Sequence, residues 1–237
     1  MQKDKNQGKE PKKDKKKYVI LILIIFLLLW FVSKFILNVS FEIVGNEKDG
    51  YGLKVEKQSI LIIGEPYSYI LYEDHVKLLE YMGWDEEIWV PDKIAGRDVT
   101  IIGEDCFVGV WNTIFKVTLH DKIEVIEKNA FWNSPKLWGV LGGTNVKVVG
   151  ENAFAECEML SVLELGENLE AIEENAFFHC VNLKELSPQQ KLVRIERGAF
   201  AFSGLETFIF NEDAVWDEDA FMETTWQSTH PNFSTGE

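Results

Sequence analysis

A phenylalanine that returns at nearly constant spacing is the feature that most constrains the fold. The successive spacings are 24, 23, 23, 23 and 21 residues, and a large apolar residue stands five positions before each Phe. The Phe column consists of Phe107, Phe131, Phe154, Phe177, Phe200 and Phe221, and the second column of Ile102, Ile126, Val149, Ile172, Ile195 and Trp216. A unit of this size cannot bury its own apolar face, so stacked coils that share one continuous core are expected.

An LxxLxL pattern follows each Phe and is clearest at Leu160, Leu163 and Leu165. Because side chains alternate in a strand, this pattern predicts one short strand per coil, with the Leu positions inward and the intervening residues outward. Gly142 and Pro188 take the third position in two coils. Both residue types interrupt strands, so these two strands are predicted to end early.

These residues carry a resemblance to a known family. The stretch Val149–Leu165 fits the pattern I-G-x-x-A-F-x-x-C-x-x-L-x-x-L-x-L and resembles the BspA-type (Treponema-pallidum-type) leucine-rich repeat of bacterial and protist surface proteins. The lead-in from Tyr67 to Gly103 is similar to the opening coil of such arrays. The resemblance implies a β-rich leucine-rich-repeat solenoid of about five to six 23-residue coils over residues 67–225. The family's Gly after the Ile is kept at Gly103 and Gly150, and the replacements are Glu127, Glu173, Glu196 and Asp217.

Small residues three positions after each Phe form a further core column. Its members are Val110, Ser134, Cys157, Cys180 and Ser203. Cys157 and Cys180 should stack in adjacent coils at about 5 Å, which permits a disulfide outside the cytoplasm. The family pattern implies small buried thiols in this column instead, so free core cysteines are the favoured interpretation and a disulfide is the alternative.

The N-terminal part has the composition of a membrane anchor. Residues 1–17 contain eight Lys, and residues 18–38 form a mostly apolar stretch with a single charge, Lys34. About 20 such residues span a bilayer as a helix, and the basic flank stays cytoplasmic. We therefore predict a basic cytoplasmic tail at 1–17 and a single transmembrane helix at 18–38, with the rest outside the cytoplasm. A cleaved secretory signal and a buried helix of a soluble domain are the alternatives.

Two further segments complete the predicted organisation. Residues 39–66 contain alternating apolar and polar stretches, which predict a juxtamembrane β cap of two or three strands over the first coil. Residues 226–237 lack periodicity and are predicted to form a flexible C-terminal tail.

Charge excludes one class of partner. Residues 1–38 carry +6 of a total charge of −15, which leaves −21 for residues 39–237. Such an acidic domain repels phosphate backbones, so nucleic acid is not expected as a partner.

Motifs for catalysis, cofactors or metals are absent from the sequence. No G-x-S-x-G, H-E-x-x-H, P-loop or G-x-G-x-x-G motif occurs, and the acidic clusters lack the spacing of a calcium loop. His75, His120, His179 and His230 are scattered without ligand spacing. No catalytic residue, cofactor or metal site is therefore predicted, and an enzyme is not expected.

The remaining candidate for a functional site is a binding surface. The outward residues of the LxxLxL strands should line the concave side of the array, and we call this set the LxxLxL face. Its two columns are Glu87, Lys116, Gly139, Val162, Glu185 and Thr207, and Trp89, Thr118, Leu141, Glu164, Ser187 and Ile209. Repeat proteins bind ligands on such extended faces. Trp89, Leu141, Val162 and Ile209 are apolar where a solvated sheet favours polar residues, which suggests a contact patch, although scattered surface apolar residues are also common.

Trp111, Trp132 and Trp138 lie on or beside the predicted turns, where two roles are possible: stacking on sugar rings and packing between coils.

The leading hypothesis is a membrane-anchored, outward-facing binding module for a protein or carbohydrate ligand at the cell surface, acting in adhesion or interaction. The alternative is an ectodomain that serves as a scaffold or sensor and pairs laterally with another membrane protein.

Overall fold

The computed structural model describes the backbone of residues 39–43, 55–58 and 66–230 and the side chains of residues 66–230. Within these ranges no helix has the length and apolar character that a membrane crossing requires. The predicted cytoplasmic tail 1–17 and transmembrane helix 18–38 lie outside the described residues.

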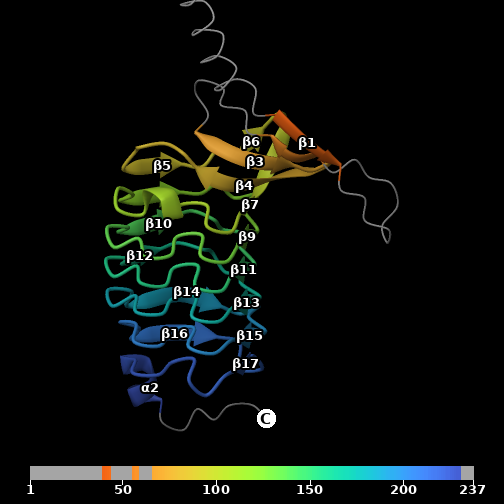
Figure 1. The fold of residues 1–237 in the computed structure, drawn as a ribbon. Helices are drawn as coiled ribbons and strands as arrows, with labels where there is room; N and C mark the ends of the chain where they lie inside the picture. The colour runs from red at the N-terminus through yellow and green to blue at the C-terminus, as the bar shows by residue number, and fades with distance from the viewer. Residues whose placement is uncertain (1–38, 44–54, 59–65, 231–237) are drawn as a thin grey trace, which may run out of the picture. The chain divides into compact units, whose positions relative to one another are not determined.

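An antiparallel meander precedes the coils (Figure 1). It consists of β1 (Val39–Ile43), β2 (Val55–Gln58), β3 (Tyr67–Leu71) and β4 (His75–Tyr81). Strand β3 belongs to this cap rather than to the parallel coils, because a tight turn in which the Tyr72 N–H donates to the His75 carbonyl, at 2.9 Å, makes β3 and β4 antiparallel. Strand β4 then pairs in parallel with β7, which joins the cap to the first coil.

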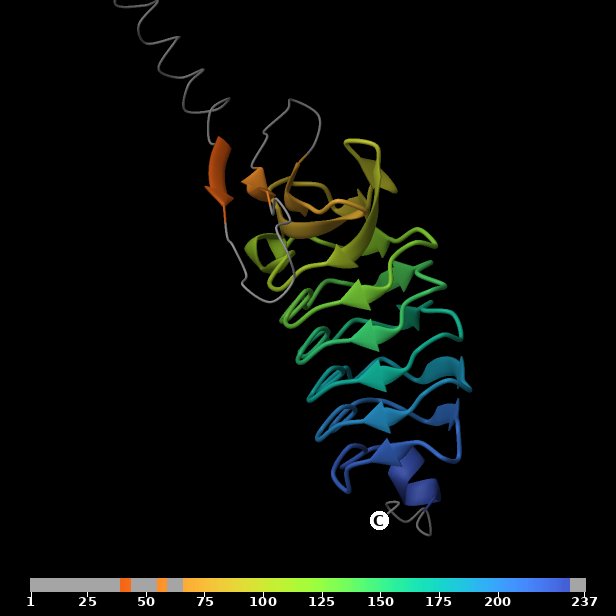
Figure 2. The ribbon, with the colours of Figure 1, turned by 90° about the vertical axis from the view of Figure 1, so that its right-hand side faces the viewer.

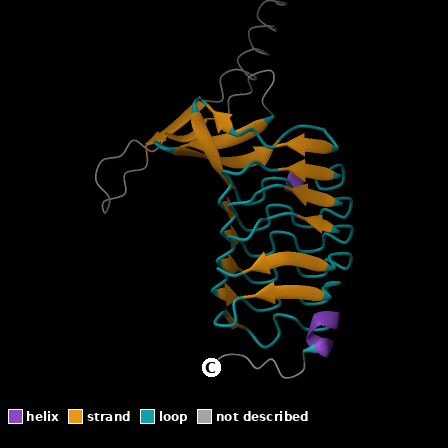
Figure 3. Ribbon diagram, turned by 180° about the vertical axis from the view of Figure 1, so that it is seen from behind, coloured by secondary structure: helices purple, strands orange, loops and turns teal. Residues whose placement is uncertain are grey.

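Each coil contributes one strand to each of two faces (Figures 1 and 3). The long sheet continues from the cap through β7 (Arg97–Ile102), β9 (Val125–Ile126), β11 (Val148–Val149), β13 (Ala171–Ile172), β15 (Arg194–Ile195) and β17 (Val215–Trp216), with β6 (Lys93–Ile94) antiparallel to β7. The other face holds β5 (Glu87–Trp89), β8 (Lys116–Thr118), β10 (Gly139–Leu141), β12 (Val162–Leu163), β14 (Glu185–Gln189) and β16 (Thr207–Phe210). A short 3₁₀ helix, η1 (Val108–Val110), lies in the first coil.

The predicted core columns are confirmed. Ile126, Val149 and Ile172 pair directly across β9, β11 and β13, as the 23-residue register requires. All six rings of the Phe column are completely buried. Adjacent rings stack with centroids 4.7 to 5.4 Å apart and with interplanar angles of 4° to 14°. This spacing is close to the distance between neighbouring strands, so each ring packs on the ring of the next coil. Figure 2 shows the backbone of the stacked coils.

The turns around each Phe form a second set of links between coils. The N–H groups of Asn152, Phe154 and Glu156 donate to carbonyls of the next coil at 2.8 to 2.9 Å. Asn152 and Glu156 have positive φ angles of 54° and 62°, and this left-handed backbone turns the donors toward that neighbour. Asn adopts this conformation readily, whereas Glu does so at a cost of about 1–3 kcal/mol.

One of the two predicted early strand ends is wrong. Strand β10 does end at Leu141, before Gly142, but β14 continues through Pro188 to Gln189. The register shifts between Leu186 and Gln189, so Gln189 takes the buried core position with no exposed surface. Its amide is satisfied there: Oε1 accepts the Leu169 N–H at 3.1 Å, and Nε2 donates to the carbonyls of Gly166 at 2.6 Å and Ser187 at 3.0 Å.

The last coil is closed by α2 (Thr225–Thr229), whose N-cap Thr224 accepts the Gln227 N–H. Trp226 is buried against Phe221, with ring centroids 4.2 Å apart, and its Nε1 donates to the Phe208 carbonyl at 3.1 Å. The predicted tail therefore begins later than residue 226, because Trp226 covers the apolar end of the Phe column. Residues 231–237 lie outside the described residues.

Replacing Phe154 by Ala is expected to lower the free energy of unfolding by about 3–5 kcal/mol, because it opens a cavity between two stacked rings. Urea unfolding of the purified chain measures this change. The matched control is Phe202→Ala, since Phe202 is 41% exposed, and its cost should stay below about 1 kcal/mol. Equal losses in the two variants would contradict the role of the Phe stack.

Candidate binding face

The structure brings the two predicted columns of the LxxLxL face into register. Glu87 and Trp89 of β5 pair with Lys116 and Thr118 of β8, and these pair with Gly139 and Leu141 of β10. In the last two coils Glu185 of β14 pairs with Thr207 of β16. The predicted columns are therefore confirmed from β5 to β10, and Glu185 pairs with Thr207 as predicted. The register of β14 and β16 shifts between Leu186 and Gln189, so the second column is not continued there by a pairing of Ser187 with Ile209.

Exposure separates the predicted face residues into two groups. Trp89 and Ile209 present 70% and 58% of their surface to solvent. Glu87, Glu164, Glu185, Ser187 and Thr207 are also exposed, whereas Lys116, Thr118, Leu141 and Val162 are half-buried. Gly139 is buried. The face thus presents apolar groups near each end with charged groups between them.

The face is interrupted between β12 and β14. The strands of this face fall into a four-stranded sheet, β5-β8-β10-β12, and a separate two-stranded sheet, β14-β16. A hollow of about 450 Å³ lies at the break, and its lining includes Val162, Glu164, Glu185, Pro188 and Ile209. The long sheet behind it is continuous through β13 and β15, so only the LxxLxL side is opened. The sequence did not predict this hollow. Only Pro188, which predicted an interrupted strand, pointed to an irregularity at this position.

Some polar groups on the face already form an ion pair or a hydrogen bond within the chain. Lys116 Nζ forms an ion pair with Glu87 at 2.5 Å, and Glu164 accepts the Gly142 N–H at 3.3 Å. The Thr118 hydroxyl is buried, and its oxygen has no hydrogen-bond partner among the described residues. A buried polar atom without a partner is uncommon, and this one lies in the column that also holds Trp89 and Leu141.

The opposite face is organised differently. Ion pairs link adjacent coils there, for example Lys122 with Asp98 and Lys147 with Glu124, both at 2.8 Å. Asn145 and Asn168 continue this ladder, since the Asn168 amide donates to the Asn145 side-chain oxygen at 3.2 Å. These polar groups satisfy one another, which favours the LxxLxL face as the contact surface.

The Glu residues that replace the family's Gly have a structural role. The carboxylate of Glu127 accepts the Glu104 N–H at 3.0 Å, and that of Glu173 accepts the Glu151 N–H at 3.2 Å. Each Glu therefore satisfies a backbone donor of the preceding coil. Some of the acidic residues of the solenoid therefore serve as hydrogen-bond acceptors for the backbone.

The tryptophans beside the turns differ in their packing. Trp138 stacks on Phe115 of the preceding coil, with ring centroids 5.9 Å apart and planes 9° from parallel. Trp138 therefore packs between coils, one of the two predicted alternatives. Phe115 was missed as its partner, although its spacing of 23 residues from Trp138 was available. Trp111 and Trp132 remain 40% and 42% exposed.

The cysteines are free and buried, so the disulfide alternative for Cys157 and Cys180 is not adopted. The Sγ atoms of Cys157 and Cys180 donate to the carbonyls of Phe131 and Phe154 at 3.1 and 3.0 Å. Burial raises the pKa of the Cys157 thiol to about 12 and raises the pKa of the Cys180 thiol as well. Both thiols are therefore protonated core groups rather than nucleophiles.

Comparison with known families decides the identity of the repeats. A model of the BspA type leucine rich repeat region matches residues 100–227 with six copies, which is more than half of the 237 residues. The chain belongs to the BspA-type leucine-rich-repeat family. The comparison with curated protein sequences gave no match.

Solved structures of leucine-rich-repeat proteins share the fold. A leucine-rich cell surface protein of Faecalibacterium prausnitzii matches with a TM-score of 0.62 and 24% identity over 67% of this chain and 45% of that protein. The T. pallidum leucine-rich-repeat protein matches with a TM-score of 0.52 and 17% identity over 65% of this chain and 79% of that one. A protein of Eubacterium ventriosum gives 0.50 and 16% over 67% and 48%. The match thus spans less than half of the first and third of these proteins.

The BspA-type repeat predicts unreactive thiols in the native chain. Because burial raises the thiol pKa values, Ellman's reagent at pH 8 is expected to label Cys106, Cys157 and Cys180 only after urea unfolding. A thiol whose pKa is higher in the folded than in the unfolded protein contributes to the free energy of unfolding. This contribution is fully present below the unfolded pKa of about 8.5 and is lost as the pH rises through the folded pKa. Rapid labelling of the folded protein would contradict the buried column.

Proposed function

We propose that this chain is a membrane-anchored binding module that presents its leucine-rich-repeat solenoid outside the cytoplasm and binds a protein or glycan through the LxxLxL face. It has no catalytic role in this proposal. The observation that carries it is the exposure of Trp89 and Ile209, at 70% and 58%, in the two outward columns of that face. A few residues supply most of the energy at binding surfaces, and Trp is enriched among them.

The hollow between β12 and β14 supports the same surface. Its lining includes the apolar side chains of Val162 and Ile209 and the polar side chains of Glu164, Glu185 and Ser187. A recess that combines apolar walls with a few polar groups suits a protruding side chain or a sugar. The neighbouring columns extend the contact over several coils, which favours a ligand larger than the recess itself.

The anchor and orientation rest on the sequence. Residues 18–38 are apolar apart from Lys34, and residues 1–17 are basic, which favours a single span with the N-terminus in the cytoplasm. The Faecalibacterium prausnitzii protein with the same fold is described as a cell surface protein, which agrees with this placement. A domain of charge −21 that faces outward would bind by apolar and hydrogen-bonding contacts, not by attraction to polyanions.

The binding face is tested by matched substitutions of exposed apolar residues. Ile209 and Val215 are equally exposed, at 58%, but Ile209 lies on the LxxLxL face and Val215 on the opposite sheet. The full chain in detergent is screened on glycan arrays and matrix-protein panels. For a ligand found there, Trp89→Ala and Ile209→Ser should each weaken binding by about tenfold or more, while Val215→Ser leaves it unchanged. Loss only in Val215→Ser would assign binding to the opposite sheet.

The orientation is tested by protease treatment of intact cells that carry the full chain with a tag at each terminus. The C-terminal tag should be lost, whereas the N-terminal tag stays on a protected membrane fragment, because the basic flank remains in the cytoplasm. Permeabilised cells serve as the control in which both tags are cleaved. Protection of the C-terminal tag in intact cells would reverse the proposed topology.

A further inference from the structure

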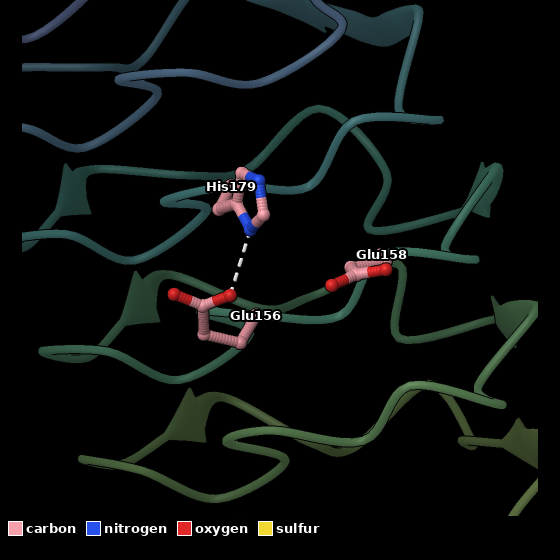
Figure 4. A group of neighbouring side chains, drawn as sticks. All are labelled: Glu156, Glu158 and His179. Carbon is pink, nitrogen blue, oxygen red and sulfur yellow. Dashed lines mark hydrogen bonds and ion pairs between the residues drawn. The ribbon is translucent and has the colours of Figure 1, made fainter.

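Three metal-ligating side chains gather on one edge of the solenoid, away from the LxxLxL face columns. They are Glu156 and Glu158, on the turn after Phe154, and His179, on the same turn of the next coil (Figure 4). One ligand atom from each side chain lies within 4.8 Å of the other two. His179 Nδ1 is 2.7 Å from an Oε atom of Glu156, and the Glu158 carboxylate points toward this pair from the side.

The repeat places these groups together. Glu156 and His179 are 23 residues apart and stand two positions after successive members of the Phe column. Both backbones are held by hydrogen bonds to the following coil, from the Glu156 N–H to the Phe178 carbonyl at 2.9 Å and from the His179 N–H to the Ala201 carbonyl at 3.0 Å. The side chains therefore start from fixed neighbouring positions, and binding an ion requires only small rotations.

The arrangement occurs once among the described coils. The other residues two positions after the Phe column are Gly109, Asn133, Phe202 and Glu223, and the other residues four positions after it are Trp111, Pro135, Val181, Gly204 and Thr225. None of these places three donors side by side. The repeat therefore sets the positions of these side chains, and the combination of donor residues at those positions is particular to these two coils.

The charge of the cluster is not balanced by a basic residue. Some Glu carboxylates of the solenoid pair with Lys or Arg of an adjacent coil, as Glu124 does with Lys147 and Glu151 with Lys128. Within the part of the chain that the structure describes, neither Glu156 nor Glu158 forms an ion pair with Lys or Arg. Two carboxylates beside an imidazole thus leave a local negative charge that a cation would neutralise.

We propose that Glu156, Glu158 and His179 form a binding site for one divalent transition-metal ion, with Zn²⁺ as the probe. An imidazole nitrogen with two carboxylate oxygens is a donor set for Zn²⁺, Ni²⁺ or Cu²⁺, whereas Ca²⁺ and Mg²⁺ favour oxygen ligands alone. Three protein ligands leave at least one coordination position for water or for a group from a bound partner. The ion would join two adjacent coils through their side chains.

The experiment is isothermal titration of the full chain in detergent with ZnCl₂, and with CaCl₂ in parallel. The wild type should bind one Zn²⁺ per chain with saturation, and binding should weaken in acid, because protons compete with the metal ion for the ligand atoms. CaCl₂ should give no comparable saturation. The three Cys thiols do not compete, because they are buried in the core.

Two substitutions remove one ligand each, and a third serves as the matched control. His179→Asn keeps a residue that tolerates the positive φ of 56° at this position, and Glu158→Gln keeps the shape of the side chain. Each should lower Zn²⁺ affinity at least about tenfold. His75→Asn is the control, because His75 pairs with Asp74 at 2.6 Å without a third ligand, and it should leave affinity unchanged.

Thermal unfolding of each variant checks that the fold is retained. Absence of saturable Zn²⁺ binding by the wild type would overturn the proposal. So would Zn²⁺ binding that survives either His179→Asn or Glu158→Gln, or an equal response to CaCl₂. Binding of Zn²⁺ is independent of the LxxLxL face, so its outcome leaves the proposed ligand-binding function to its own test.

Discussion

The contact between one coil and the next is the interaction on which the rest of the structure depends. A single coil of about 23 residues has two very short strands and one large aromatic ring, which cannot form a core alone. Stacking supplies what each coil lacks, because Phe154 packs between Phe131 and Phe177 at 5.0 and 5.4 Å. The two ends of the stack then need separate closure, which the antiparallel cap and Trp226 provide.

The stacking of coils also holds the backbone in place, through hydrogen bonds between adjacent coils. Parallel pairing involves only two residues per coil in most of the long sheet, so the sheets alone would bind adjacent coils weakly. Hydrogen bonds from the left-handed turns and from carboxylates such as Glu127 and Glu173 add links at positions between the strands. Among the buried side-chain polar atoms of the described residues, the hydroxyl oxygens of Tyr67, Thr118 and Ser134 have no hydrogen-bond partner.

A scaffold of this kind separates stability from function. Core positions repeat because every coil meets the same neighbours, whereas outward positions are free to vary from coil to coil. The candidate features of this chain all lie outside the repeated core positions: Trp89 and Ile209 on the LxxLxL face, the hollow beside Pro188, and the cluster around His179. In our proposal these surface residues serve contact with a ligand and are not required for folding.

The repeat pattern is sufficient to predict the period, the core columns, most of the outward columns and the family, because each coil has the same local environment and a core residue must recur at the same interval. Tertiary structure alone decided what depends on pairing across the chain. The hairpin assigned β3 to the cap, the shifted register placed Gln189 in the core, and Trp226 closed the last coil. The juxtaposition of Glu158 with His179 also required coordinates, since single donors 21 residues apart form no sequence motif, and only the stacking of two turns brings them together.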